Sequence, residues 1–165
     1  MTEQDFVDWI INGWMRERPD INIEGKGIVC RILRLYAIYY KTADLYLSPF
    51  KLQPNEFSVL VRLRRCGPDG EITQKALLAE VLITSGAMTN LMARLIKNGL
   101  IEKRQSKDDK REVRVRLTDK GKKLIDAAME VQAKVERDLV KDLKPKDRKE
   151  LERLLKTFLL TVDSK

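Results

Sequence analysis

The chain has 165 residues, with 33 Lys or Arg against 25 Asp or Glu, so its formal net charge is +8 at pH 7. This length suits one domain with helical extensions, and the excess of cations favours a polyanionic partner such as nucleic acid. Histidine is absent, and no cysteine or acidic cluster has metal-ligand spacing. We therefore expect neither an enzyme nor a metal or cofactor site. No apolar run approaches the 18 residues that a membrane span requires.

Two features bear on location. Cys30 and Cys66 lie far apart in the chain, which fits free thiols in a reducing compartment better than a disulfide framework. The first residues, MTEQDFVDW, carry acids where a signal peptide would carry cations, so we expect a cytoplasmic protein. Both cysteines have apolar neighbours, but Arg64 and Arg65 adjoin Cys66, and response to thiol oxidation therefore stays open.

The first third of the chain predicts two helices. Residues 2–16 form an amphipathic segment ended by Pro19, and we treat 1–22 as an N-terminal arm that docks on its own or a partner subunit. Trp14 in this arm could also cover a ligand pocket. Residues 28–46 carry a wide apolar stripe and end before Pro49. The stripe is wider than one small domain needs, so part of it is expected to face another chain.

The next segment has the spacing of a helix-turn-helix. A helix over 54–66 begins with Pro54, which the first turn of a helix tolerates, and ends at the sequence CGPDG. Glu71 and Ile72 could form a short strand, and Thr73 is placed to cap the next helix. That helix turns at Leu82 and Ile83 into a further helix, and in this motif the second helix enters the DNA groove.

The helix expected over Thr84–Leu100 is a candidate recognition helix. Its apolar residues are Met88, Leu91, Met92, Leu95 and Ile96, whose spacing puts them on one face. Thr84 or Ser85 could cap its start, and Asn98-Gly99 ends it. The opposite face lacks acids and carries Gly86, Thr89, Asn90, Ala93, Arg94 and Lys97. Asn and Arg can pair with base edges and Lys can meet phosphate, although an ordinary helix with a solvated basic face has the same pattern.

After Gly99 the periodicity changes to that of a β-hairpin. A strand over 100–106, the polar turn KDDKR and an alternating strand over 112–117 contain seven cations. Directly after a recognition helix, such a hairpin is a wing, and an Arg at its tip can enter the minor groove. The alternatives are a solubilising charged hairpin and a winged helix that contacts proteins instead of DNA.

Two further helices are expected at the C-terminus, over 118–143 with Thr118 as the cap and from Pro145 to about 162. We expect them to flank the winged lobe on the far side from helix 28–46. The terminal helices have more apolar surface than this lobe can cover, which favours a C₂ dimer on a palindromic operator. The predicted fold is mainly α with a small β-wing (α+β). Within one domain, 1–165, residues 53–117 are the winged helix-turn-helix, and 28–50 and 118–163 are dimerisation helices.

The runs LQPNEFSVLVRLRR and ITQKALLAEVLITSGAMTNLMARLIKNGLIEKRQSKDDKREVRVRLTDKGKKL resemble the MarR (multiple antibiotic resistance regulator) family, over roughly residues 30–160. The resemblance implies a homodimeric winged-helix repressor or activator of transcription whose affinity for double-stranded DNA changes with small, often phenolic or anionic, molecules. By motif position it assigns recognition to Ser85, Thr89, Asn90 and Arg94, the minor groove to Arg111, and support of that Arg to Asp109. With the neighbouring residues, the expected DNA-binding set is Ser85, Gly86, Thr89, Asn90, Arg94, Lys97, Lys110, Arg111 and Arg114.

The N-terminal string WMRERPDI is similar to a branch of that family which includes urate-responsive regulators. The resemblance implies a ligand site in which Trp14 and Arg65 match the branch, whereas Ser58 stands where it has Asp. The neutral, shorter Ser puts urate itself in doubt and favours another aromatic or anionic molecule. With apolar walls from the groove between helices 28–46 and 54–66, the expected ligand set is Trp14, Tyr36, Tyr40, Phe57, Ser58 and Arg65.

Overall fold

A computed structural model of the chain describes residues 4–66, 70–81, 85–105 and 113–164. Its elements, in chain order, are α1 (Phe6–Glu17), α2 (Lys26–Leu47), the 3₁₀ helix η1 (Ser48–Phe50), α3 (Pro54–Arg64), β1 (Ile72–Thr73), α4 (Gln74–Glu80), α5 (Ser85–Lys97), β2 (Ile101–Gln105), β3 (Val113–Leu117), α6 (Asp119–Val140) and α7 (Pro145–Asp163). None of the helices in these ranges is long and apolar enough to cross a membrane.

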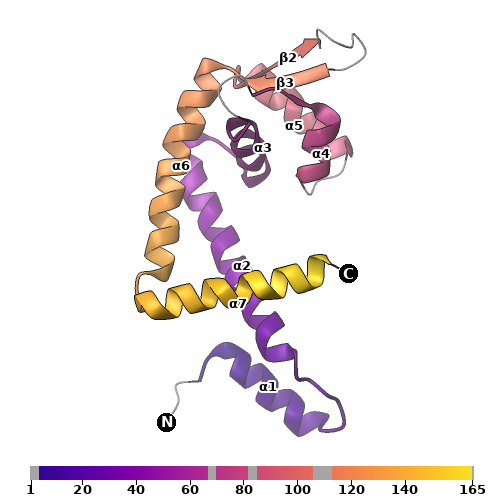
Figure 1. Ribbon diagram of the computed structural model, residues 1–165, viewed down its shortest axis with the longest axis vertical. Helices are drawn as coiled ribbons and strands as arrows, with labels where there is room; N and C mark the ends of the chain where they lie inside the picture. The colour runs from indigo at the N-terminus through magenta and orange to yellow at the C-terminus, as the bar shows by residue number, and fades with distance from the viewer. Residues whose placement is uncertain (1–3, 67–69, 82–84, 106–112, 165) are drawn as a thin grey trace.

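The molecule is elongated, with a winged lobe at one end (Figure 1). This lobe contains α3, α4, α5 and the strands, while α2 and α6 extend from it toward α1 at the other end. The strands form an antiparallel sheet in the order β1-β3-β2, so the expected two-stranded hairpin gains a third strand. The prediction of a mainly helical fold with a small β-wing is confirmed.

The third strand is held by main-chain pairing at the start of the helix-turn-helix. Ile72 pairs with Val115 and Thr73 with Arg114, one residue along from the predicted strand at Glu71 and Ile72. Thr73 also caps α4 as predicted, because its Oγ1 accepts the N–H of Ala76 at 3.0 Å. The strand therefore fixes where α4 begins relative to the wing.

The arm docks on α2 of its own subunit. Asp5 caps α1 by accepting the N–H groups of Val7 and Asp8, and the Asp8 carboxylate accepts the N–H of Asp5. Arg31 of α2 donates to Asp5 at 2.8 Å and to Asp8 at 2.6 Å, and it holds the pKa of Asp5 below its ordinary value. Val7 is the buried residue of α1, whereas Trp9 and Trp14 are exposed. The arm is therefore held by these ion pairs together with the burial of Val7.

The core lies inside the winged lobe, between α3, α5, the sheet and the first half of α6. Its most deeply buried side chains include Leu47, Leu60, Leu63, Leu77, Met88, Met92, Leu95, Ile101, Val115 and Ile125. Ile96 was predicted to join the apolar face of α5, but it is 39% exposed. It follows Met88 by eight residues, which turns it by about 80° and leaves it at the edge of the buried stripe.

The prediction that the C-terminal helices flank the lobe on the far side from the first long helix is wrong. The Tyr39 hydroxyl of α2 donates to Glu136 of α6 at 2.9 Å and accepts from Gln132 at 2.7 Å. Arg64 of α3 pairs with Asp126 of α6 at 2.7 Å. Helix α6 thus packs against both α2 and α3, because its residues find partners on each of them. No residue of Pro145–Asp163 is buried.

Candidate nucleic-acid interface and the cavity beside it

The outer face of α5 is open to solvent. Met88, Leu91, Met92 and Leu95 point into the core, as their spacing predicted. Gly86, Thr89, Asn90, Arg94 and Lys97 are exposed on the other side of the helix. The side chain of Ser85, and Thr84 before it, lie outside the described residues. The exposed face combines small, hydrogen-bonding and cationic side chains without an acid, which suits close approach to a polyanion.

The carboxyl end of α5 is fastened to the start of α6. Gly99 has φ 68°, the left-handed conformation predicted for the end of this helix. The Thr118 hydroxyl donates to the Gly99 carbonyl at 2.6 Å, and the Thr118 N–H donates to the Leu100 carbonyl at 3.1 Å. Lys120 donates to the Asn98 carbonyl at 2.8 Å, where a cation also suits the helix dipole.

Gly121 makes the same junction tight. A Cβ atom at this position would lie 2.0 Å from the Leu100 carbonyl oxygen and 2.9 Å from its carbon. The Gly121 N–H donates to Thr118 Oγ1 at 3.0 Å, which confirms Thr118 as the cap of α6. The first turn of α6 thus lies directly on the main chain that follows α5, and the two helices are coupled through backbone atoms.

The wing pairs β2 with β3, so that Glu102 lies opposite Arg116 and Arg104 opposite Arg114. Glu102 accepts from Arg116 and lies 3.2 Å from Arg104, and the Arg116 bond holds the pKa of the Glu102 carboxyl below its ordinary value. Two of the predicted wing cations are therefore partly neutralised in place. Arg114 is half-buried on β3, and the predicted tip residues Asp109, Lys110 and Arg111 lie outside the described residues.

Arg94, predicted to read bases, makes two contacts with the amino end of α3. Its Nε lies 3.2 Å from Glu56 Oε1, and its Nη1 donates to Gln53 Oε1 at 3.1 Å. Glu56 is 1% exposed, which is unusual for a carboxylate. Glu56 was not among the residues predicted from the sequence. A signal for it was available, because Glu follows three residues after the Gln that precedes the helix-starting Pro54.

A cavity of about 520 Å³ lies between α2, α3 and α6. Five of the six residues predicted to bind a ligand line it: Tyr36, Tyr40, Phe57, Ser58 and Arg65. Trp14 is not among the described residues that line it. It lies on α1 with Lys26 Nζ 5.3 Å from its ring centroid, because α1 packs against the amino-terminal part of α2. The cavity borders the carboxyl-terminal half of the same helix.

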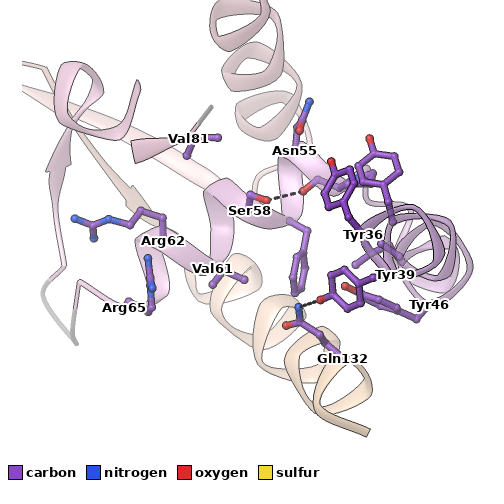
Figure 2. Close-up of a pocket in the computed structure, with 15 residues that line it drawn as sticks. Tyr36, Tyr39, Tyr46, Asn55, Ser58, Val61, Arg62, Arg65, Val81 and Gln132 are labelled. Atoms are coloured by element: carbon purple, nitrogen blue, oxygen red, sulfur yellow. Dashed lines mark hydrogen bonds between the residues drawn. The ribbon is translucent and has the colours of Figure 1, made fainter. Parts of the chain in front are cut away.

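The cavity has an aromatic end and a cationic end (Figure 2). At the aromatic end, Tyr46 meets Phe57 edge to face with ring centroids 6.1 Å apart, and burial raises the pKa of Tyr46. Arg62 and Arg65 lie at the other end, across from the tyrosines. Ser58 lies between them and donates to the Pro54 carbonyl at 3.0 Å. The cavity thus offers aromatic surface, hydroxyl groups and positive charge together.

Several lining residues were not in the predicted ligand set, among them Tyr39, Tyr46, Arg62 and Gln132. Tyr39 and Tyr46 are seven residues apart and share a helix face with the predicted tyrosines, so their spacing could have identified them. Gln132 is a polar residue within the apolar stripe of α6. Only the packing of α6 against α2 brings it to the cavity.

A helix-turn-helix whose second helix is followed by an antiparallel wing defines a winged helix-turn-helix protein. Residues 52–113 match the MarR family. The multiple antibiotic resistance protein MarR of Salmonella typhimurium is 31% identical over 115 residues, 69% of this chain and 78% of that protein. The HTH-type transcriptional regulator PecS of Dickeya dadantii is 28% identical over 149 residues, 90% of each chain. The chain belongs to the MarR family of winged-helix transcriptional regulators.

A solved structure extends the likeness to three dimensions. The crystal structure of a mutant MarR from Escherichia coli complexed with operator DNA superimposes with a TM-score of 0.69 at 27% identity. The match covers 84% of this chain and 99% of the E. coli chain.

Proposed function

We propose that the protein is a cytoplasmic transcriptional repressor that binds a pseudo-palindromic operator as a homodimer and leaves it when a small aromatic, anionic effector binds. The observation that carries the DNA-binding part is the exposed, acid-free face of α5 beside a hairpin rich in cations. In this proposal α5 enters the major groove, where Asn90 reads a base edge and Lys97 meets phosphate. The wing contacts the adjacent minor groove.

The homodimer is supported by the apolar surface that one subunit leaves exposed. On α7 this surface comprises Leu151, Leu154, Leu155, Phe158, Leu159, Leu160 and Val162. On α2 it comprises Ile28, Val29, Leu33, Leu35, Tyr36, Ile38 and Tyr40. So many exposed apolar side chains on two helices favour an interaction site. A second copy related by a two-fold axis covers the same surface on both subunits and sets two α5 helices on one face.

The effector class is supported by the cavity between α2, α3 and α6. Aromatic walls facing Arg62 and Arg65 suit a flat aromatic acid, whose ring contacts the tyrosines while its charge meets a guanidinium. Ser58 supplies a hydroxyl where the urate-responsive branch has a carboxylate, so we propose an effector other than urate. Because the cavity adjoins α3, occupancy can change how the winged lobes are spaced, provided the two states bind the ligand with different affinity.

Selection of bound duplexes from a random pool, followed by titration at several salt concentrations, tests DNA binding. Asn90→Ala should cost about 1–3 kcal/mol on the selected operator and relax the preference at one base pair. Lys97→Ala should weaken binding to all duplexes alike and reduce the salt slope by about one. A parent protein that enriches no sequence and shows no salt-dependent shift would overturn the proposal and favour a protein-contact module.

Titration with salicylate, urate and related aromatic acids, followed by tryptophan fluorescence and operator release, tests the effector. The expected ligand releases DNA from the parent, and Arg65→Ala should raise the concentration required. Lys123→Ala, which changes an exposed cation away from the cavity, is the matched control and should leave that concentration unchanged. Ser58→Asp should gain affinity for urate if the likeness to the urate-responsive branch extends to the site. Equal release from the parent and Arg65→Ala would place the pocket elsewhere.

One contact beside the cavity favours thiol oxidation as a second regulatory signal. Arg62, which lines the cavity, donates from Nη1 to Cys66 Sγ at 2.9 Å. A thiol beside a guanidinium is a target for oxidation, and an oxidised Cys66 that no longer accepts this bond would alter the cavity. Operator binding before and after mild peroxide tests this, with Cys66→Ser and Cys30→Ser as a pair. Peroxide-induced release that persists in Cys66→Ser would exclude Cys66 as the sensor.

A further inference from the structure

Glu56 is a buried carboxylate whose two oxygens have different surroundings. Oε2 accepts the Gln53 N–H at 2.9 Å and completes the capping box of α3. Oε1 is buried and accepts no hydrogen bond from the residues that the structure describes. The cation that faces it is Arg94, with Nε at 3.2 Å. A buried carboxylate without a cation is strongly unfavourable, so Arg94 matters to the fold before any DNA is present.

Arg94 joins α5 to the amino end of α3. Its side chain is 51% exposed, yet Nε faces Glu56 and Nη1 is bonded to Gln53. A bidentate bond to a guanine needs two guanidinium N–H groups aimed at one base edge. If the guanidinium turned toward a base, it would lose its contacts with Glu56 and Gln53. The charge of Glu56 would then be buried and unpaired.

We propose that Arg94 is a positioning residue, which holds the recognition helix to the amino end of α3 through Glu56 and Gln53 and does not read a base. This inference rests on the proposed binding of DNA by α5. Pro54, Asn55, Phe57 and Ser58, the neighbours of Glu56 in α3, line the cavity. A ligand that displaces this part of α3 therefore acts on α5 through the Arg94–Glu56 ion pair.

The test uses the intact protein and four variants, Arg94→Ala, Arg94→Lys, Glu56→Gln and the double variant Arg94→Ala/Glu56→Gln. Affinity is measured for the selected operator and for each of its single base-pair changes, and the thermal midpoint is measured without DNA. Arg94→Ala should lower the affinity for every duplex by a common factor of about ten and should lower the midpoint.

Glu56→Gln removes the buried charge while its amide oxygen can still accept the Gln53 N–H. In the Arg94→Ala background it should restore most of the midpoint and most of the affinity. Arg94→Lys should stay near the parent in both, because an ammonium still balances Glu56 but cannot make a guanidinium's planar bidentate base contact. Lys97→Ala is the matched control on the same helix. It should leave the midpoint unchanged and should gain nothing from Glu56→Gln.

A base-reading role gives the opposite pattern. Arg94→Ala and Arg94→Lys would both lose discrimination at one base pair, and Glu56→Gln would rescue neither. That result, or a midpoint unchanged by Arg94→Ala, overturns the proposal. If the parent binds no duplex, the proposed function fails, but the thermal midpoints still test the role of Arg94. A midpoint that falls in Arg94→Ala and recovers in Arg94→Ala/Glu56→Gln supports the ion pair as the contact that holds α5. A midpoint that does neither refutes it.

Discussion

The junction between α5 and α6 should not tolerate a methyl group at Gly121. A Cβ there would lie 2.0 Å from the Leu100 carbonyl oxygen, whereas ordinary contacts begin at 3.4 Å, so the two segments must separate by 1.4 Å, the difference between these distances. The atom in the way belongs to the backbone and cannot rotate aside. The same separation would stretch the bonds from Thr118 to the carbonyls of Gly99 and Leu100, which are 2.6 and 3.1 Å long.

The expected cost follows from these contacts. Two hydrogen bonds contribute about 0.5–1.5 kcal/mol each, and overpacking typically costs about 1–3 kcal/mol. The better helix propensity of Ala returns at most about 1 kcal/mol. Gly121→Ala should therefore lower the free energy of unfolding by about 1–5 kcal/mol. It should also weaken operator binding, because the carboxyl end of α5 moves with the junction.

Urea denaturation followed by circular dichroism, at one fixed protein concentration, measures the change. Gly13→Ala is the matched control, because it lies within α1 and a Cβ there would meet nothing within 4 Å. That variant should be as stable as the parent or more stable by about 0.5–1 kcal/mol. If Gly121→Ala unfolds at the same urea concentration as the parent, the close approach of α6 to Leu100 does not exist in solution.

Three further predictions concern other parts of the chain. Because burial raises the pKa of Tyr46 above its ordinary 10.0, its contribution to stability is complete below pH 10.0 and is lost as the pH rises through the folded-state pKa. Tyr46→Phe should therefore show a smaller loss of stability than the parent between about pH 9 and 11 in urea titrations, and equal losses would refute this. Removal of residues 144–165 should abolish the dimer, since each buried Leu or Phe contributes about 1.5–3 kcal/mol, and unchanged sedimentation of a folded chain would contradict it. Arg31→Ala should speed amide exchange in α1 by breaking its pairs with Asp5 and Asp8 while the thermal midpoint hardly changes; unchanged exchange would show that other contacts hold the arm.

Periodicity predicted the helices and the wing because each of them buries one face. The apolar residues of that face recur in the sequence at the spacing of a helix or a strand. The core residues of α5, the left-handed Gly99 and the caps Thr73 and Thr118 all follow from local rules of this kind. The strand at Ile72 was placed within one residue, although only its pairing with β3 stabilises it.

The errors and omissions concern contacts between elements. The packing of α6 on α2 and α3 depends on how those two helices lie together, and no local pattern encodes this. Glu56 is a charged residue in an otherwise ordinary capping position, and its burial depends on Arg94, 38 residues later. Five cavity residues were found because α2 and α3 are consecutive, whereas the position of Trp14 depends on where the arm docks along a long helix.

The bonds that join α5 to α6 have a geometric consequence. With 22 residues, α6 is about 33 Å long at 1.5 Å per residue, and the recognition helix is fixed near its first turn. If α6 pivots about its far end, a tilt of about 5° displaces the first turn by about 3 Å, close to the spacing of one base pair. In the proposed two-fold dimer, the two α6 helices would shift their α5 helices in opposite directions. A small angular change in α6 would then be enough to move both α5 helices out of register with the proposed operator.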